Sequence, residues 1–386
     1  MNTTQSQQIR ILTKAIAGEL SNEEGAQAMG KSVRQFERLR SAFRRLGVEA
    51  VIHGNTGQEP VNKVESQTRE RVLKLVRETY KGFNEHHVTE MLREREHIDI
   101  SLSTVRRICR EAGIQSPRPH RRRRVHRTLR ERSSREGMML QMDGSPHAWV
   151  EKRGPKFTLV SAIDDATGRL WGVFREGETL EAYMALMRII AEDRGLPGCV
   201  YTDMSAIVAG TSRRYKRVPT DESCGPQSQF GRACSELDIS VVLAHSAQAK
   251  GRTERSHQTL QDRLVSLLRL EAISTLSEAN RYLQEKYLPD HNQRFICPPL
   301  DTEPAWRSWS SPLAMDDVFC VKHERKVAKN STVHIFGNII AVNKGPQGQS
   351  YIDQWVTVHR RYDLSIGVFH DNTFIGGQQS ASAQIH

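Results

Sequence analysis

The stretch over residues 239–270, ISVVLAHSAQAKGRTERSHQTLQDRLVSLLRL, decides the fold class. It opens with a short apolar run over 239–243, passes through a small polar turn, and after Gly251 has leucines at positions 260, 264, 267 and 268. This spacing is typical of an amphipathic helix, so the stretch predicts a buried strand that leads into a helix. Glu254 lies in the first turn of that helix. Taken alone, it is most simply an acid that stabilises the helix start.

Two aspartates follow other strand-like runs. Asp143 closes the segment MMLQMDG, and Asp203 closes CVYTD. Ligand sites of open α/β sheets lie beyond the carboxyl ends of the strands, so these aspartates and Glu254 can converge. Three carboxylates in one place repel one another unless divalent cations lie between them, and oxygen ligands suit Mg²⁺ or Mn²⁺. Two ions about 4 Å apart can hold the attacking and leaving oxygens of a phosphoryl displacement.

Five blocks, in this order, resemble the catalytic core of the DDE transposases of bacterial insertion sequences, in particular the group called ISNCY, which are kin to retroviral integrases. The blocks are QMDGSPHAW, LVSAIDDATGRL, VYTD, SQFGRACSELDI and AQAKGRTERSHQTLQDRL. The flanking regions match as well, so the resemblance covers nearly the whole chain. It implies a ribonuclease-H-like domain in which Asp143, Asp203 and Glu254 are the catalytic residues and the metal ligands.

The resemblance also implies a reaction. Asp143 would bridge two Mg²⁺ ions per active site, for which Mn²⁺ can substitute, while Asp203 and Glu254 each complete the coordination of one. Water would hydrolyse a phosphodiester at the transposon end, and the freed 3′-hydroxyl would attack target DNA by the same in-line route. The chain departs from the group at Met204-Ser205, where a basic pair is expected, and at Gln261, where many relatives have Lys or Arg.

The composition agrees with a nucleic-acid partner. The chain has 386 residues, a formal net charge of +11 and a pI near 9.5, which favour a polyanion, and no apolar run approaches the roughly 20 residues of a spanning helix. Six scattered cysteines form no CxxC pair, so the sequence indicates neither a zinc knuckle nor a disulfide framework. We expect double-stranded DNA as partner, both transposon ends and target. We also expect a homo-oligomer, dimeric or higher, no membrane, and a nucleoid-associated place in the bacterial cytoplasm.

The expected fold class is multidomain: N-terminal all-α helix-turn-helix modules, a central α/β ribonuclease-H-like catalytic domain and a small SH3-like C-terminal β-barrel. Capping patterns at Ser21 and Ser32, with glycines as helix stops, mark the first helical trio. The predicted parts are a helix-turn-helix domain (1–50), a linker (51–63), a second helix-turn-helix or winged-helix-like domain (64–115), an Arg-rich linker (116–136), the catalytic core (137–290), a linker (291–315), the barrel (316–377) and a disordered tail (378–386).

Basic and amide side chains on the two helical trios, the Arg-rich linker and the 251–270 helix are the expected DNA contacts. They are Arg34, Arg38, Arg44, Arg45, Arg106, Arg107, Arg110, Arg121, Arg122, Arg123, Arg124, Lys250, Arg252, Arg255, Gln258 and Gln261. A simpler reading remains open for each set, because a surface helix can be basic without touching DNA and a run of arginines can be a solvated linker.

Within the core we expect strands at 138–142, 157–163, 170–175, 200–203 and 239–243, and helices at 180–193 and 229–237. Other carboxylates compete for the catalytic role: Asp164 and Asp165 suit a structural turn, and Glu222 and Glu236 suit solvated positions. Two other functions remain open. One is a domesticated or regulatory DNA-binding protein that never cuts, and the other is a nuclease of the same fold that does not join strands.

Overall fold

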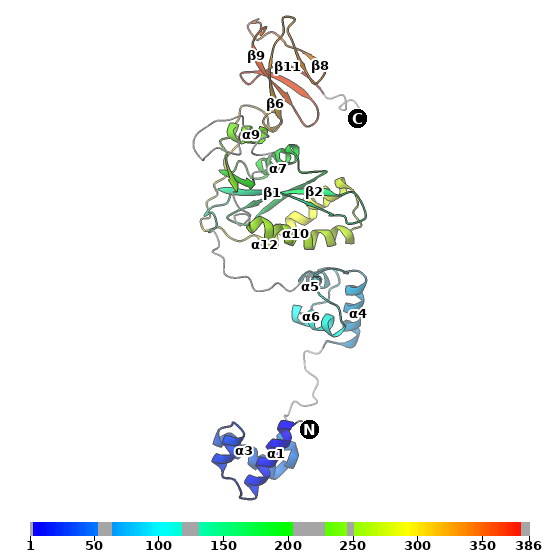
Figure 1. Ribbon diagram of the computed structural model, residues 1–386, viewed down its shortest axis with the longest axis vertical. Coiled ribbons are helices and arrows are strands. Elements are labelled where there is room, and N and C mark those ends of the chain that lie inside the picture. Colours follow the sequence, from blue (N-terminus) through cyan, green and yellow to red (C-terminus); the bar gives the residue numbers. More distant parts are fainter. Residues whose placement is uncertain (1–2, 53–63, 118–130, 204–227, 245–250, 380–386) are drawn as a thin grey trace. The chain divides into compact units, whose positions relative to one another are not determined.

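The computed structural model describes residues 3–52, 64–117, 131–203, 228–244 and 251–379, and describes Asp203, Arg252 and Glu254 by their backbone alone (Figure 1). The chain separates into two compact units, Met1–Glu70 and Arg71–His386. Each is described by itself.

The first unit holds three helices, α1 (Thr3–Ile16), α2 (Asn22–Ala28) and α3 (Val33–Leu46), and a 3₁₀ turn over Gly47–Val51. Ser21 and Ser32 form the expected capping boxes with Glu24 and Gln35. The apolar residues at both ends of α3, Val33 and Leu46, are exposed. Only Phe36 of α3 is fully buried, because this small bundle covers little more than the middle of the helix.

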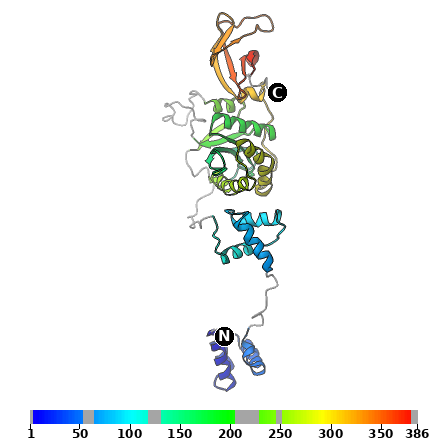
Figure 2. The same cartoon turned by 90° about the vertical axis from the view of Figure 1, so that its right-hand side faces the viewer.

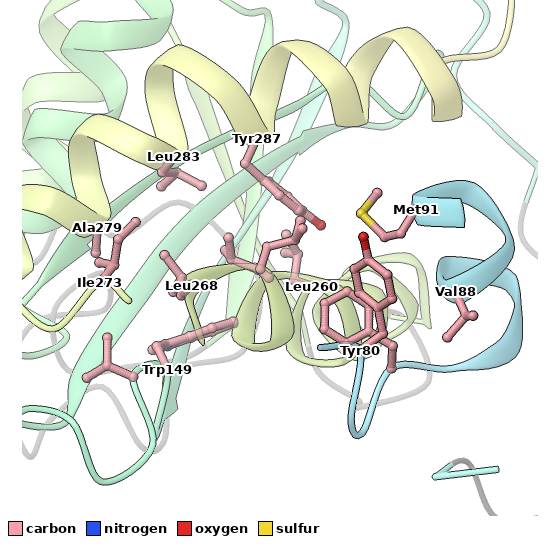
Figure 3. Packing of buried hydrophobic residues seen from close by; sticks show 14 of the residues in the cluster. Tyr80, Val88, Met91, Trp149, Leu260, Leu268, Ile273, Ala279, Leu283 and Tyr287 are labelled. Atoms are coloured by element: carbon pink, nitrogen blue, oxygen red, sulfur yellow. The ribbon is translucent and has the colours of Figure 1, made fainter. Parts of the chain in front are cut away.

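A second helical group comprises α4 (Ser66–Arg77), α5 (Glu85–Glu94) and α6 (Leu102–Glu111). Asn84 and Ser101 cap α5 and α6, since each side chain accepts a hydrogen bond from a first-turn backbone N–H. The residues of this group in the second unit, from Arg71 onward, share a hydrophobic core with helices that follow the central sheet. Figure 3 shows Tyr80 and Met91 beside Leu260 and Tyr287 in that core.

The central sheet has five strands in the order β3-β2-β1-β4-β5. They are β1 (Met139–His147), β2 (Phe157–Asp164), β3 (Leu170–Arg175), β4 (Cys199–Asp203) and β5 (Ser240–Ala244). Short turns join β1, β2 and β3 as an antiparallel meander, whereas β4 and β5 run parallel to β1. This is the mixed sheet that the sequence predicts.

Helices cover both faces of the sheet (Figures 1 and 2). On one face lie α7 (Leu180–Asp193) and α9 (Gln229–Glu236), packed on Leu140, Met142 and other inward residues of β1 to β4. The opposite face carries α10 (Gly251–Leu270), α11 (Leu276–Tyr282), a π turn (Leu283–Tyr287) and α12 (Leu288–Phe295). The alternation of side chains along each strand assigns odd-numbered residues of β1 to the α10 face.

The strand that holds Asp143 is longer than expected. We predicted residues 138–142, but β1 continues to His147 through Gly144 and Pro146. Beyond Gln141 its pairing with β4 has ended and β2 is its remaining partner. Proline has no backbone N–H to donate to a neighbouring strand. Pro146 is tolerated because the edge of β1 that faced β4 is unpaired there.

The last part of the chain is a β-rich domain, preceded by α13 (Met315–Val318). Four strands form one sheet in the order β11-β10-β9-β6, and β7 and β8 form a hairpin. Their bounds are Val321–Lys326 (β6), Thr332–Ile335 (β7), Asn338–Ala341 (β8), Trp355–Arg360 (β9), Ile366–His370 (β10) and Thr373–Gln378 (β11). β6 is a strand that the sequence analysis missed, because five consecutive polar residues, Lys322 to Lys326, hide its alternation.

Candidate active site

Asp143 and Asp203 lie on neighbouring parallel strands. β1 pairs with β4 through Leu140 with Val200 and Gln141 with Tyr201. The same register, followed two residues further, sets Asp143 opposite Asp203. Residues in register on adjacent strands share a face of the sheet, and strands are about 4.8 Å apart. The expectation that Asp143 ends its strand is wrong, since it lies inside β1, but the pairing with β4 has stopped before it.

Helix α10 lies on the same face and brings a histidine to Asp143. The Nε2 atom of His257 is 2.9 Å from the Ser161 hydroxyl oxygen, and Ser161 pairs with Asp143 across β1 and β2. Its Nδ1 atom is 4.0 Å from Oδ2 of Asp143. His257 is buried, whereas the Asp143 side chain keeps 19% of its surface exposed. One edge of this carboxylate therefore faces protein and the rest is accessible.

Glu254 lies in the first turn of α10, one helical turn before His257. The residue before Glu254, Thr253, is buried against the sheet. The strand register and the first turn of α10 thus bring three carboxylate-bearing positions to one face of the sheet. Among side chains that the structure describes, no three His, Cys, Asp or Glu residues cluster as a metal site, and those of Asp203 and Glu254 are outside that description. Carboxylates of this kind fit Mg²⁺ or Mn²⁺, which prefer oxygen ligands.

The neighbouring carboxylates have structural roles, as expected for Asp164 and Asp165. Asp164 accepts hydrogen bonds from the Gly137 and Thr167 backbone N–H groups at 2.9 and 2.8 Å. Burial raises the pKa of the Asp164 carboxyl, although these hydrogen bonds act in the opposite direction. Asp165 accepts from the Gln141 amide at 2.7 Å. Glu236 is not simply solvated, because it pairs with Arg232 and Lys322 at 2.9 and 2.7 Å. Glu222 lies outside the described residues.

The structure describes most of the residues that are expected to contact DNA. Exposed side chains on α3, α6 and α10 are those of Arg34, Arg38, Arg44, Arg45, Arg106, Arg107, Arg110, Arg255 and Gln258. Arg121, Arg122, Arg123, Arg124 and Lys250 fall outside the described residues, and so does the Arg252 side chain. Gln261 differs from the others, since its amide donates to the Ser145 hydroxyl at 3.2 Å. Its role as a DNA contact remains a prediction.

Sequence reasoning missed the residues that surround Asp143. His257 follows Glu254 by three positions, and that helical spacing placed it on the same side of the helix. Ser161 gave no comparable indication, because the antiparallel register that pairs it with Asp143 depends on the length of the turn between β1 and β2.

Two curated proteins are similar to this chain in sequence. The transposase y4bF of Sinorhizobium fredii is 30% identical over 372 residues, which are 95% of this chain and 79% of that protein. The transposase of insertion sequence IS1202 of Streptococcus pneumoniae is 34% identical over 322 residues, which are 74% of this chain and 67% of that protein. No family model matches the chain.

Among solved structures, one similar chain comes from a simian T-cell lymphotropic virus intasome in complex with the PP2A regulatory subunit B56 gamma. It is 13% identical, covers 80% of this chain and 99% of its own length, and has a TM-score of 0.33. The HTLV-2 integrase catalytic core domain in complex with magnesium is 18% identical. The match covers 39% of this chain and 87% of that domain, and the TM-score is 0.29. Scores this low support no conclusion, so the relationship depends on the two transposases. On their identity and coverage, the chain belongs to the transposases of bacterial insertion sequences, the DDE enzymes that its motifs resemble.

Proposed function

We propose that this transposase binds the terminal inverted repeats of its insertion sequence and catalyses metal-dependent strand cleavage and strand transfer through Asp143, Asp203 and Glu254. The proposal includes a ribonuclease-H-like core around the mixed sheet, helix-turn-helix modules at α1–α3 and α4–α6, and an SH3-like C-terminal domain. The enzyme would act as a homo-oligomer on paired ends in the bacterial cytoplasm, in association with the nucleoid.

One observation supports this function most directly. The β1–β4 register, whose last pair is Gln141 with Tyr201, would align Asp143 with Asp203 when extended by two residues, and α10, whose first turn holds Glu254, lies against β1 on the same face. When bound there, Mg²⁺ supplies Lewis-acid activation of an attacking oxygen and neutralises charge on the phosphate. Asp143, Asp203 and Glu254 would hold two such ions. The exposed arginines of α3 and α6 would bind the DNA ends and fix their orientation.

The test compares single amide variants of the three carboxylates. Asp143→Asn, Asp203→Asn and Glu254→Gln should each lower end cleavage below detection, because an amide keeps the shape of the side chain and loses the charge that holds the cations. Binding of end DNA should stay within about twofold, since the recognition helices are elsewhere. Glu285→Gln, at an exposed position between α11 and α12, is the matched control and should cleave normally.

Joining is measured separately, with a pre-cut end that already carries a 3′-hydroxyl and with Mg²⁺ or Mn²⁺ in the reaction. Strand transfer by Asp143→Asn at the rate of the unchanged chain would exclude the assignment. Tight end binding by the unchanged chain without any metal-dependent cleavage would instead identify a regulatory DNA-binding protein. Cleavage without joining of the pre-cut end would identify a nuclease.

A further inference from the structure

Three polar contacts join β1 to α10 along their length. Thr253 donates from its hydroxyl to the Gln141 side-chain oxygen at 3.0 Å. The His257 ring lies 4.0 Å from Asp143 and bonds to Ser161 at 2.9 Å. The Gln261 amide donates to the Ser145 hydroxyl at 3.2 Å. We call the residues of these three contacts the polar ladder: Gln141, Asp143 and Ser145 on β1, with Thr253, His257 and Gln261 on α10.

The two elements have matching repeats. The strand residues are spaced by two positions and the helix residues by four, and both series run in the same direction along the chain. Two strand residues advance about 6.6 Å, and four helix residues advance about 6 Å. Each ladder residue of the helix therefore meets its strand partner without a change of register across about two helical turns.

The ladder lies where the sheet is otherwise apolar. On the same face, β2 and β3 present Leu159, Ile163 and Leu170 to the helices. Apolar contacts have little directionality, so they tolerate a small slide or rotation of a helix. Hydrogen bonds between buried side chains do not, because a shift leaves donors and acceptors unpaired. Gln141 is 1% exposed and Thr253 is 2% exposed, so water cannot replace the lost partner in place.

Both ends of the Gln141 amide are fixed. Its nitrogen donates to Asp165 at 2.7 Å while its oxygen accepts from Thr253. Asp165 also accepts hydrogen bonds from the backbone N–H and the hydroxyl of Ser133, at 2.8 and 3.0 Å. The contact of Thr253 with Gln141 therefore connects α10 to the turn after β2 and, through Asp165, to Ser133 near the end of the Arg-rich linker.

We infer that the polar ladder sets the position of α10 on β1, and that Gln141, Thr253, His257 and Gln261 are positioning residues for the catalytic carboxylates. Thr253 directly precedes Glu254, so its bond to Gln141 holds the first turn of α10 beside the strand of Asp143. His257 limits the movement of the Asp143 side chain from the protein side. The inference rests on the proposed function, because it assumes that Asp143 and Glu254 act together.

Thr253→Val tests the ladder with the smallest change, since it replaces a hydroxyl by a methyl group. We expect about a tenfold higher Mn²⁺ concentration for half-saturation of the full-length protein, measured by electron paramagnetic resonance of free Mn²⁺, and faster hydrogen exchange of the first turn of α10 without metal. The kcat for end cleavage should fall by a similar factor at unchanged KM for end DNA. Gln141→Leu should act in the same direction.

Two controls separate positioning from general damage. Thr253→Ser retains the hydroxyl and should restore Mn²⁺ binding and exchange to within about twofold of the unchanged chain. Thr259→Val makes the same substitution on the same helix, where the hydroxyl donates within the helix to the Arg255 backbone oxygen, and should change none of the readouts.

The outcomes are distinct. Unchanged Mn²⁺ binding and unchanged exchange in Thr253→Val and Gln141→Leu would overturn the ladder, whatever their activity. If the unchanged chain binds end DNA but never cleaves it, the proposed function fails. The exchange measurement without metal still tests the ladder in that case, and faster exchange in Thr253→Val but not in Thr259→Val would support it.

Discussion

His87 on α5 is a buried histidine that the structure keeps uncharged. Its ring stacks on Phe83 with 4.5 Å between the ring centres, and its Nδ1 atom has no hydrogen-bond partner among the described residues. Burial, aided by the nearby Arg263 guanidinium, lowers the pKa of His87 from 6.5 to about 3. At a pH between these two pKa values, His87 binds a proton in the unfolded chain and does not bind one in the folded chain.

Acidification should therefore destabilise the second unit. The contribution of His87 is fully present above pH 6.5 and is lost as the pH falls from 6.5 toward 3. We expect His87→Leu to flatten the fall of the free energy of unfolding between pH 7 and pH 5, by up to about 1.4 kcal/mol per pH unit, as measured by denaturant unfolding. His86→Leu is the matched control, because that neighbouring ring is exposed. An equal slope in His87→Leu and the unchanged chain would contradict the buried neutral ring.

The sequence predicts some residues of the site better than others. Asp143, Asp203 and Glu254 can be proposed from the sequence because each lies at a recognisable place in a motif, and their catalytic role stays a prediction. Gln141 and Ser145 were not, because polar residues alternating with Leu140 and Met142 are typical of a strand with one solvated face. That face is instead covered by α10. Local alternation cannot distinguish a polar face in water from a polar face that finds its partners on a helix more than 100 residues away.

At the scale of elements, α5 contacts α10 and α12 through half-buried ion pairs. Arg263 of α10 donates two hydrogen bonds to Glu90 of α5, at 2.6 and 2.8 Å, and Arg294 of α12 approaches the same carboxylate at 3.2 Å. Burial acts to raise the pKa of Glu90, but the hydrogen bonds and charges of the two arginines outweigh it and the net shift is downward. This carboxylate is thus stabilised in its charged form.

Removing Arg263 should leave the half-buried Glu90 carboxylate with Arg294 as its remaining partner and without the two hydrogen bonds from Arg263. We expect Arg263→Ala to destabilise the second unit by about 2 kcal/mol. Hydrogen exchange of α5 should accelerate, because the loss falls on its contact with α10. Arg93 also lies on α5, and its partner Asp99 lies beyond the end of that helix; both side chains are exposed, so Arg93→Ala should cost about 0.5 kcal/mol or less. Equal effects of the two variants would show that the Arg263–Glu90 pair does not hold α5 in place.

Elements with a strong local pattern were predicted closely, while their ends and contacts were not. The helix expected at 180–193 is α7 (Leu180–Asp193), and the strand expected at 170–175 is β3 (Leu170–Arg175). β1 was cut short, because Gly144 and Pro146 are turn residues by local preference and are tolerated only where the β4 edge is unpaired. The docking of α5 on α10 joins residues about 170 positions apart, and no periodicity within either helix indicates it.

At the scale of the whole molecule, the excess of positive charge is concentrated in particular segments. Nine arginines and two glutamates lie between Ser116 and Glu136. Several described arginines have acidic partners, as Arg71 has Glu96, Arg135 has Asp301 and Arg188 has Glu192. Because residues 121–124 are four adjacent arginines with no carboxylate beside them in the sequence, we expect them to bind phosphates more strongly than arginines that are paired with carboxylates. Phosphate binding should therefore depend more on the run than on the net charge.

Replacing residues 121–124 by glutamine should reduce the salt dependence of DNA binding, because each phosphate contact releases a counterion. The slope of log K against log salt should fall by up to about 3.6, which is about 0.9 for each of four contacts.

The charge-matched control replaces four ion-paired arginines by glutamine, Arg71, Arg93, Arg95 and Arg188. Both variants lose four positive charges, so a general effect of net charge would change both slopes equally. Fluorescence anisotropy of end DNA between 50 and 200 mM salt, about the range over which such contacts are resolved, measures the difference. A slope that is unchanged in the 121–124 variant would mean that the run is a solvated linker and that the phosphates are bound elsewhere.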